Sequence, residues 1–242
     1  MIKSYDLLMS FGCSFTEGGG LNNPNYHRYL SGDTDLYKPP FVILPCYNEY
    51  MNHHSYPGYL SRLLNCPYIN EGTSCASNEL ILKKVYDTFK DWQDDRKILV
   101  TIQSSILSRI LLYLTDEKRY INLNRLHDLD EDVKKYYESY LTMFFDIQNE
   151  YQKLVQNIDL YTNWLSSKNI DMCWILYDIP TIMPTGTHIV NFENQNLRSY
   201  AHGKKLTLTD LPNFPYDDKH FSITGNEIIA NIIYNHMSNY HD

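Results

Sequence analysis

A serine follows a short apolar run in the stretch DLLMSFGCSFTEG, residues 6–18. Residues 6–11 predict a buried strand, because the run is only a few residues long and leads into a glycine turn. Residues 97–103 and 172–177 are apolar runs of the same kind, and residues 67–70 are a weaker one. Short apolar runs of this type are typical of a parallel sheet that is covered on both faces.

Segments with helical spacing of apolar residues separate these runs. We expect helices at 59–64, 78–92, 131–167 and 226–237. In the second of them, the helical spacing is that of Leu80, Ile81, Val85 and Phe89. Strands that alternate with helices predict an α/β domain with one sheet and right-handed crossovers.

The chain length of 242 residues suits one such domain, and we treat residues 1–242 as a single domain. Two stretches exceed the needs of a minimal α/β fold, at 18–55 and 181–217, and both contain several prolines. We expect them to be long loops. Loops of this length are usually functional, and both adjoin the residues that we expect to carry the chemistry.

The composition indicates a globular protein with an acidic balance. Hydrophobic residues make up 43% and charged residues 21%, and the net charge is −8. This charge argues against duplex nucleic acid as a partner, because such binding depends on Lys and Arg, and against docking on an anionic membrane. The 22 Tyr outnumber the 9 Phe. The surplus suits sugar-binding surfaces as well as cores, although low-GC codon usage is the simpler explanation.

The N-terminus and the cysteines bear on the compartment. Residues 1–10 lack the apolar region and the small-residue cleavage site of a signal peptide, and no apolar run approaches the ~18 residues that span a bilayer. The five cysteines show no C-x-x-C pair and no zinc-type spacing. An odd number in a domain of this size favours reduced thiols, and we therefore expect a cytoplasmic protein.

Ser14 is the first candidate for chemistry. It follows the predicted strand at its carboxyl end, which is the edge of an open α/β sheet where ligands bind. If a helix begins near Phe15, its unpaired N–H groups can stabilise a nearby oxyanion. Taken alone, a serine at this place is more often a helix cap.

His220 is the second candidate, and it lies near the other end of the chain in the sequence Asp217-Asp218-Lys219-His220. A serine hydroxyl is a poor nucleophile unless a base accepts its proton, and the base needs a carboxylate that fixes its tautomer. Asp217, three residues before His220, has the spacing for its carboxylate to fold back onto the imidazole. Asp218 is one residue closer, and we expect its side chain to point elsewhere. Taken alone, the motif is more often a surface turn.

Together the two motifs resemble those of the SGNH hydrolases, the GDSL-like lipase and acylhydrolase family. The first block of that family, usually Gly-Asp-Ser after the first strand, is similar to Gly12-Cys13-Ser14. The last block, Asp-x-x-His followed by Ser or Pro and a helix, is similar to residues 217–220 with Ser222 and Gly225. The resemblance implies a three-layer α/β/α sandwich with a flavodoxin-like, mostly parallel sheet of about five strands. It also implies a cofactor-free serine esterase whose catalytic triad is Ser14, His220 and Asp217.

The two middle blocks of the family match less closely. The resemblance implies that the second block supplies a backbone N–H to the oxyanion, and the register from Asn70 places this donor at Cys75, with Gly72 as the alternative. In the third block the register puts Ser105 where the family has an Asn. Gln103, two residues earlier, faces the same side of an extended strand. Either side chain could complete an oxyanion hole with the N–H groups of Ser14 and Cys75, or neither.

Four other features can be interpreted either as functional or as purely structural. Arg109 could bind a carboxylate or phosphate of the substrate, or be a solvated helix residue. His53 and His54 lack the spacing and the carboxylates of a metal site, so we expect no metal. The glycines at 18–20 lack the Gly-Lys-Ser/Thr of a phosphate-binding loop and predict a turn. Cys13 could be the nucleophile, but its side chain points away from that of Ser14 along the strand.

The sequence therefore predicts hydrolysis of a short acyl ester, such as an O-acetyl group on a carbohydrate, through an acyl-enzyme. We expect the partner to be a small-molecule or carbohydrate ester. Two alternatives stay open. An acyltransferase would use the same site with a sugar hydroxyl in place of water. A non-catalytic binding or structural protein could share the fold, because a fold alone does not fix a function.

Overall fold

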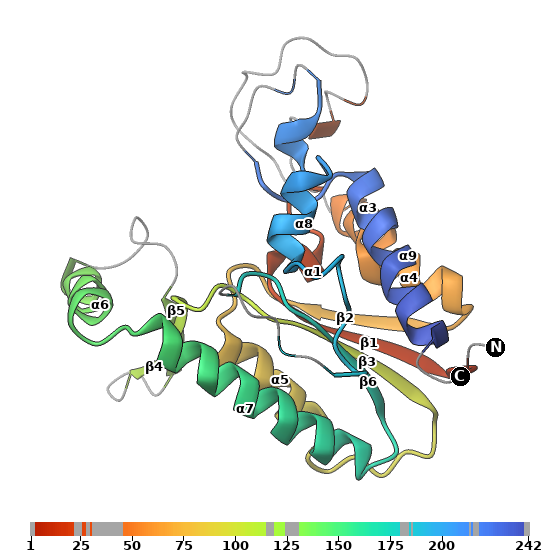
Figure 1. The fold of residues 1–242 in the computed structure, drawn as a ribbon, viewed down its shortest axis with the longest axis horizontal. Coiled ribbons are helices and arrows are strands. Elements are labelled where there is room, and N and C mark those ends of the chain that lie inside the picture. The colour runs from red at the N-terminus through yellow and green to blue at the C-terminus, as the bar shows by residue number, and fades with distance from the viewer. Residues whose placement is uncertain are drawn as a thin grey trace.

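The computed structural model describes residues 3–21, 26–27, 30, 46–114, 119–123, 131–179, 184, 186–212, 214 and 218–239. Four parallel strands form the centre of this structure (Figure 1). In spatial order they are β2 (Tyr68–Gly72), β1 (Leu7–Gly12), β3 (Ile98–Gln103) and β6 (Asp171–Ile175). A parallel bridge between Trp174 and Ile189 continues the sheet beyond β6. The prediction of a mostly parallel sheet is confirmed.

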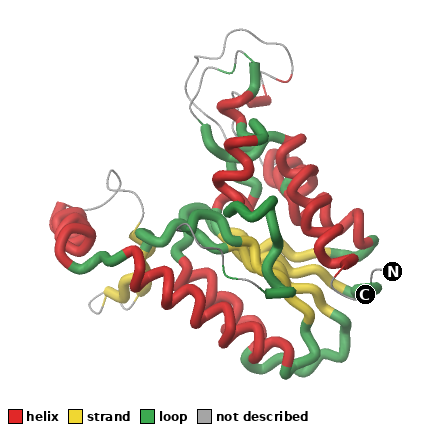
Figure 2. Tube along the Cα trace, in the orientation of Figure 1, coloured by secondary structure: helices red, strands yellow, loops and turns green. Residues whose placement is uncertain are grey.

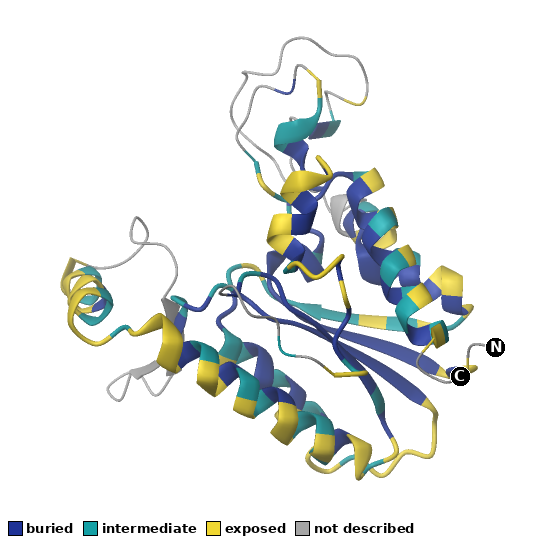
Figure 3. Ribbon diagram, in the orientation of Figure 1, coloured by how far each residue is buried: buried dark blue, intermediate teal, exposed yellow. Residues whose placement is uncertain are grey.

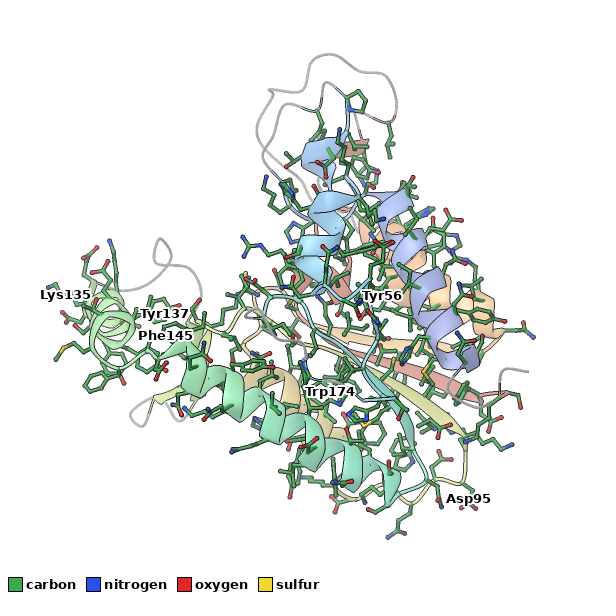
Figure 4. The ribbon with its side chains drawn as sticks, viewed as in Figure 1. Tyr56, Asp95, Lys135, Tyr137, Phe145 and Trp174 are labelled. Carbon is green, nitrogen blue, oxygen red and sulfur yellow. The ribbon has the colours of Figure 1, made fainter. Side chains whose placement is uncertain are left out.

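Helices cover both faces of this sheet and make three layers (Figures 1 and 2). One face carries α3 (Cys46–His54), α4 (Tyr56–Leu64) and α9 (Ile223–Asn239), and the other carries α5 (Asn78–Phe89) and α7 (Ile147–Ser166). Trp174 lies on the α7 side, where its Nε1 donates to Thr162 Oγ1 at 3.2 Å, whereas Tyr56 lies on the α9 side (Figure 4). The predicted α/β/α sandwich is confirmed.

The core lies between the sheet and these two layers of helices (Figure 3). Every residue of β1 and β3 is buried, which is expected for central strands with helices on both faces. Phe11 of β1 packs edge-on against Phe89 of α5, with 6.0 Å between the ring centroids. Burying a side chain of this size stabilises a fold by about 1.5–3 kcal/mol.

The predicted helix at 131–167 is two helices. The first, α6 (Glu131–Met143), ends before Phe144. The second, α7, begins after Asp146, whose carboxylate accepts a hydrogen bond from the Gln148 N–H at 2.9 Å. This cap satisfies one of the free N–H groups at the start of α7, so the chain begins a new helix there.

Two antiparallel strands that the sequence analysis did not predict adjoin α6. They are β4 (Ile110–Leu114) and β5 (Arg119–Leu123), and together with α6 they lie beyond the end of α7, away from the main sheet (Figure 1). We call β4, β5 and α6 the arm.

The two predicted long loops contain short helices. Helix α1 (Ser14–Glu17) leads into the first, which also contains α3, and the second contains α8 (Leu197–Gly203) and the 3₁₀ helix η2 (Leu208–Asp210). The remainder of 18–55 and 181–217 is described only in part. Both α1 and α8 lie near the carboxyl ends of the strands (Figure 1).

Candidate active site

Ser14 is the first residue of α1. Strand β1 ends at Gly12, and the chain turns at Cys13 into the helix. The turn is tight, because a Cβ atom on Gly12 would lie 2.0 Å from Thr16 Oγ1 and 2.9 Å from Gln103 Cβ. Only glycine fits such a close approach. The turn places Ser14 at the carboxyl edge of the sheet, where the sequence analysis expected it.

His220 reaches Ser14 from the other end of the chain. Its Nε2 lies 3.0 Å from Ser14 Oγ. The carbonyl of His220 accepts a hydrogen bond from the Leu208 N–H at 2.8 Å, and the Phe15 ring packs against the imidazole with 4.9 Å between centroids. The distance is that of a base in hydrogen-bond contact with its nucleophile.

The carboxylate at the other imidazole nitrogen is that of Asp218. Its Oδ1 lies 2.7 Å from His220 Nδ1 and also accepts the backbone N–H of His220 at 3.0 Å. An aspartate readily accepts the N–H two residues ahead, and this turn folds the carboxylate onto the imidazole. Our expectation that Asp218 points elsewhere is therefore wrong. Asp217, the predicted partner, lies outside the described residues.

Cys75 lies in the loop between β2 and α5 with a φ of +62°. Residues other than glycine seldom adopt this left-handed conformation, so the backbone here has the geometry of a glycine position. The loop is tied to the turn after β1, because the Thr73 N–H donates to the Gly12 carbonyl at 3.0 Å and Asn70 Nδ2 donates to the Thr16 carbonyl at 2.9 Å. Cys75 therefore belongs to the same edge of the sheet as Ser14.

Gly72, the alternative donor, has a packing role. It is the last residue of β2 and pairs with Gly12 of β1. A Cβ atom on Gly72 would lie 2.3 Å from the backbone nitrogen of Glu17. This close approach of β2 to α1 accounts for the glycine, and Cys75 stays the candidate donor.

Gln103 is turned into the core. Its side chain is fully buried, Oε1 accepts a hydrogen bond from Thr16 Oγ1 at 2.5 Å, and Nε2 faces Cys13 Sγ at 3.8 Å. The Thr16 hydroxyl also lies 3.0 Å from the Tyr56 hydroxyl. This buried network holds the amide beneath α1, so the hypothesis that Gln103 donates to an oxyanion is wrong.

Cys13 lacks the surroundings of a nucleophile. Its thiol is fully buried, and burial raises its pKa, although the nearby Arg109 guanidinium acts to lower it. A cysteine attacks as the thiolate. The burial therefore favours Ser14 over Cys13.

Ser105 and Arg109 are in contact at the end of β3. Ser105 is fully buried, and its N–H donates to Asn78 Oδ1 at 2.7 Å. Arg109 Nη1 donates to Ser105 Oγ at 2.8 Å and lies 3.5 Å from the Ala76 carbonyl oxygen. The prediction that Ser105 itself donates to an oxyanion does not fit this burial, whereas Arg109 is partly exposed.

Glu17 is a titratable group beside the site that the sequence analysis missed. Its carboxyl is half-buried, and burial raises its pKa, whereas Lys84, His220 and the Ser74 N–H act to lower it. Glu17 follows Ser14 by three residues on α1, and this spacing places both on one side of a helix. The spacing of three residues between Ser14 and Glu17 is the sequence signal that could have identified Glu17.

A cavity of about 460 Å³ is lined in part by Lys219 and Phe221, the two sequence neighbours of His220. Tyr177 and Phe221 line it, and their rings also pack against Phe15, with centroids 4.3 Å and 4.8 Å away. The polar and charged side chains of this cavity are those of Asp178, Arg198, Ser199, His202, Thr207 and Lys219. Arg198 is paired with Asp178 at 2.6 Å. The cavity therefore combines a mostly apolar surface with several polar groups, as ligand pockets generally do.

His53 and His54 have other contacts. His54 Nδ1 lies 3.2 Å from the Tyr59 hydroxyl, and Arg62 donates to the His53 carbonyl at 2.8 Å. Within the described ranges, no group of three or more His, Cys, Asp or Glu residues is arranged to hold a metal ion. The same part of the chain contains no helix that is both long and apolar enough to cross a membrane.

Comparisons with known proteins give distant similarities to solved structures. No family model and no curated protein matches the sequence. One similar solved structure is a lipolytic protein of the G-D-S-L family from Desulfitobacterium hafniense DCB-2, at 12% identity and a TM-score of 0.36, covering 96% of this chain and 99% of that one. Another is LAE5, an alpha/beta hydrolase enzyme from the metagenome of Lake Arreo, Spain, at 12% identity and a TM-score of 0.42, covering 98% and 97%. At this identity we derive the function from the geometry of the site.

Proposed function

We propose that the protein is a serine esterase in which Ser14 is the nucleophile, His220 the general base and Asp218 the carboxylate that orients the base. The observation that carries this proposal is the chain of contacts from Ser14 Oγ to His220 Nε2 at 3.0 Å and from His220 Nδ1 to Asp218 Oδ1 at 2.7 Å. An acceptor at Nδ1 holds the proton on that nitrogen, so Nε2 is free to accept the proton of Ser14.

The reaction has two halves. In the first, the Ser14 oxygen attacks the ester carbonyl while Nε2 of His220 takes the serine proton, and this proton then passes to the departing alcohol as its bond to carbon breaks. In the second, His220 takes a proton from water, the hydroxide oxygen bonds to the acyl carbon, and Ser14 leaves with the proton. The products are an alcohol and a carboxylic acid.

The negative oxygen of the tetrahedral intermediate would lie between the backbone N–H groups of Ser14 and Cys75. Ser14 begins α1, so its N–H has no acceptor within that helix. The hydrogen bonds that tie residues 70 and 73 to the turn after β1 bring Cys75 to the same edge. Donors that are fixed before the reaction stabilise the intermediate without reorganisation.

A short acyl group and a polar alcohol fit the surroundings of Ser14. Tyr177 and Phe221 pack against the buried ring of Phe15, the residue after the nucleophile, and these bulky neighbours favour a short acyl group. The cavity beside His220 contains polar and charged side chains within a mostly apolar lining, and these groups could bind the hydroxyl groups of an alcohol. We therefore propose an O-acetylated carbohydrate as the substrate class.

An acyltransferase would use the same contacts, with a second alcohol in place of water. Among the cysteines whose side chains the structure describes, Cys13, Cys66, Cys75 and Cys173 form no disulfide bond. Cysteines outside disulfide bonds support the cytoplasmic location that we propose.

Turnover of p-nitrophenyl acetate by the purified protein tests this function. We expect Ser14→Ala and His220→Ala each to remove nearly all turnover, and the double variant to lose little more, because the two residues act as a unit. Ser222→Ala, a change in a serine that bonds the Leu206 carbonyl, serves as the control and should retain turnover. Parental turnover in either single variant would contradict the proposal.

A further inference from the structure

One guanidinium group touches all three segments that border the nucleophile. Arg109 Nη1 donates to Ser105 Oγ at 2.8 Å and lies 3.5 Å from the Ala76 carbonyl oxygen. The same guanidinium is close enough to the Cys13 thiol to act to lower its pKa. Cys13 precedes Ser14 and Ala76 follows Cys75, so the positive charge lies near the sequence neighbours of both proposed backbone donors.

The polypeptide around Arg109 is held from several sides. The Arg109 N–H donates to the Ile106 carbonyl at 3.2 Å, and the hydroxyl of Tyr137, in the arm, donates to the Ser108 carbonyl at 2.8 Å. Ser105, which anchors the guanidinium, is fixed in turn by its bond to Asn78. These contacts give the long Arg109 side chain a defined position, and an arginine that is already positioned loses little entropy when it binds.

The contacts also leave part of the guanidinium available. A guanidinium carries five N–H donors, and the contacts to Ser105 and Ala76 are both made by Nη1. Arg109 is only partly buried, whereas the two neutral polar side chains at the end of β3, Gln103 and Ser105, are both fully buried. Among these three residues of the β3 edge, Arg109 is therefore the one that a bound substrate can reach.

We propose that Arg109 is a catalytic residue that stabilises the oxyanion together with the N–H groups of Ser14 and Cys75, and that Ser105 is the positioning residue that aims it. This inference rests on the proposed function of Ser14. A charged donor forms shorter and stronger hydrogen bonds to an anion than a neutral one does. It also attracts the negative oxygen more strongly than the neutral carbonyl of the bound ester, so it acts mainly in the transition state.

The alternative role for the same guanidinium is to bind a carboxylate or phosphate on the substrate. The two roles differ with a probe that has no such group. An uncharged alkyl fluorophosphonate reacts with an activated serine, and its phosphoryl oxygen gains negative charge as the serine attacks. An oxyanion donor accelerates this reaction, whereas a subsite for a substrate anion leaves it unchanged.

The test is the inactivation kinetics of the full-length protein with this probe, measured as the maximal rate constant and the half-saturating concentration. We expect Arg109→Ala to lower the maximal rate constant by about 10²-fold with little change in the half-saturating concentration. Arg109→Lys should retain an intermediate rate, and millimolar guanidinium chloride should restore part of the rate of Arg109→Ala. Ser105→Ala should lower the maximal rate constant less than Arg109→Ala does. The double variant should react only slightly more slowly than Arg109→Ala.

Arg96→Ala is the matched control. Arg96 is an exposed arginine that pairs with Asp94 before the start of β3, at the opposite edge of the sheet. It should react at the parental rate. A parental rate in Arg109→Ala would overturn the inference. The inference would also be overturned if Arg109→Ala and Arg109→Lys lost the same rate, both melted at a lower temperature than the parent, and guanidinium restored no rate to Arg109→Ala. If the parent itself is not labelled at Ser14, the proposed function fails, and this outcome is distinct from the other two.

Discussion

The carboxyl edge of the sheet and the arm are built in different ways. At the edge, Ser14, Gln103 and Ser105 are buried, and each residue bonds another segment of the chain, Ser14 and Gln103 through their side chains and Ser105 through its backbone N–H. Among the side chains of the arm that the structure describes, the buried hydrophobic ones are Ile110 and Tyr137, with Val133, Tyr140 and Leu141 packed against them. The end of α6 is open to solvent, with Met143 72% exposed, and the next residue, Phe144, is 71% exposed.

This difference predicts which substitutions affect catalysis and stability most. A side chain that is fixed from two sides keeps its geometry before the substrate arrives, and catalysis depends on such preorganisation. A segment with few buried contacts opens more easily and tolerates change. The Tyr137 hydroxyl, which donates to the Ser108 carbonyl at 2.8 Å, links the two regions.

The largest effect should come from the carboxylate at the site. Asp218→Asn replaces an acceptor at His220 Nδ1 with an amide, which allows the wrong imidazole tautomer. We expect turnover of p-nitrophenyl acetate to fall by about 10²–10⁴-fold. Asp217→Asn is the matched control, and its turnover should stay within about threefold of the parent. The reverse result would assign the orienting role to Asp217 and refute our use of the 2.7 Å contact.

The free energy of unfolding should depend more strongly on side chains of the core than on exposed side chains of the arm. Leu99 is fully buried in β3, and Leu99→Ala should lower the free energy of unfolding by about 2–5 kcal/mol, because it removes apolar contacts and leaves a cavity. Met143→Ser, at the exposed end of α6 in the arm, should change it by less than about 0.5 kcal/mol. Urea unfolding followed by circular dichroism measures both. Similar losses in the two variants would show that the arm is part of the same stabilising core.

The smallest effect should come from the link between the regions. Tyr137→Phe removes the hydrogen bond to the Ser108 carbonyl and keeps the ring. We expect unfolding free energy to fall by about 0.5–1.5 kcal/mol and turnover to stay within about threefold, since the Arg109 turn keeps its other contacts. Unchanged stability would show that the bond contributes nothing, and a loss of turnover comparable to that of Asp218→Asn would show that the arm controls the site.

The sequence predicted the parts of the fold that rest on apolar patterns. The runs at 6–11, 97–103 and 172–177 became β1, β3 and β6 with shifts of a residue or two, because burial on both faces demands apolar side chains at nearly every position. The break between α6 and α7 was missed, because helical spacing continues on both sides of it and a capping aspartate looks like any polar residue.

The sequence predicted the pair Ser14 and His220 of the candidate site, but not the contact of Asp218 or the position of Gln103. Ser14 was predicted from its place after a strand, where an open α/β sheet binds ligands, and His220 from the Asp-x-x-His motif that resembles the last block of the SGNH family. Asp218 was set aside on spacing alone, which ignores the turn in which an aspartate bonds the N–H two residues ahead. Strand alternation predicts the side on which Gln103 lies but not its partners, and its Nε2 donor faces Cys13 Sγ in the core.

The direct test of the central claim is mass spectrometry of the protein after reaction with an alkyl fluorophosphonate. The contact of Ser14 Oγ with His220 Nε2 at 3.0 Å predicts one covalent adduct, on the peptide that contains Ser14, and its absence in His220→Ala. Serine hydroxyls without a base do not react at a comparable rate. An unmodified parent protein, or an adduct that forms equally in His220→Ala, would contradict the account.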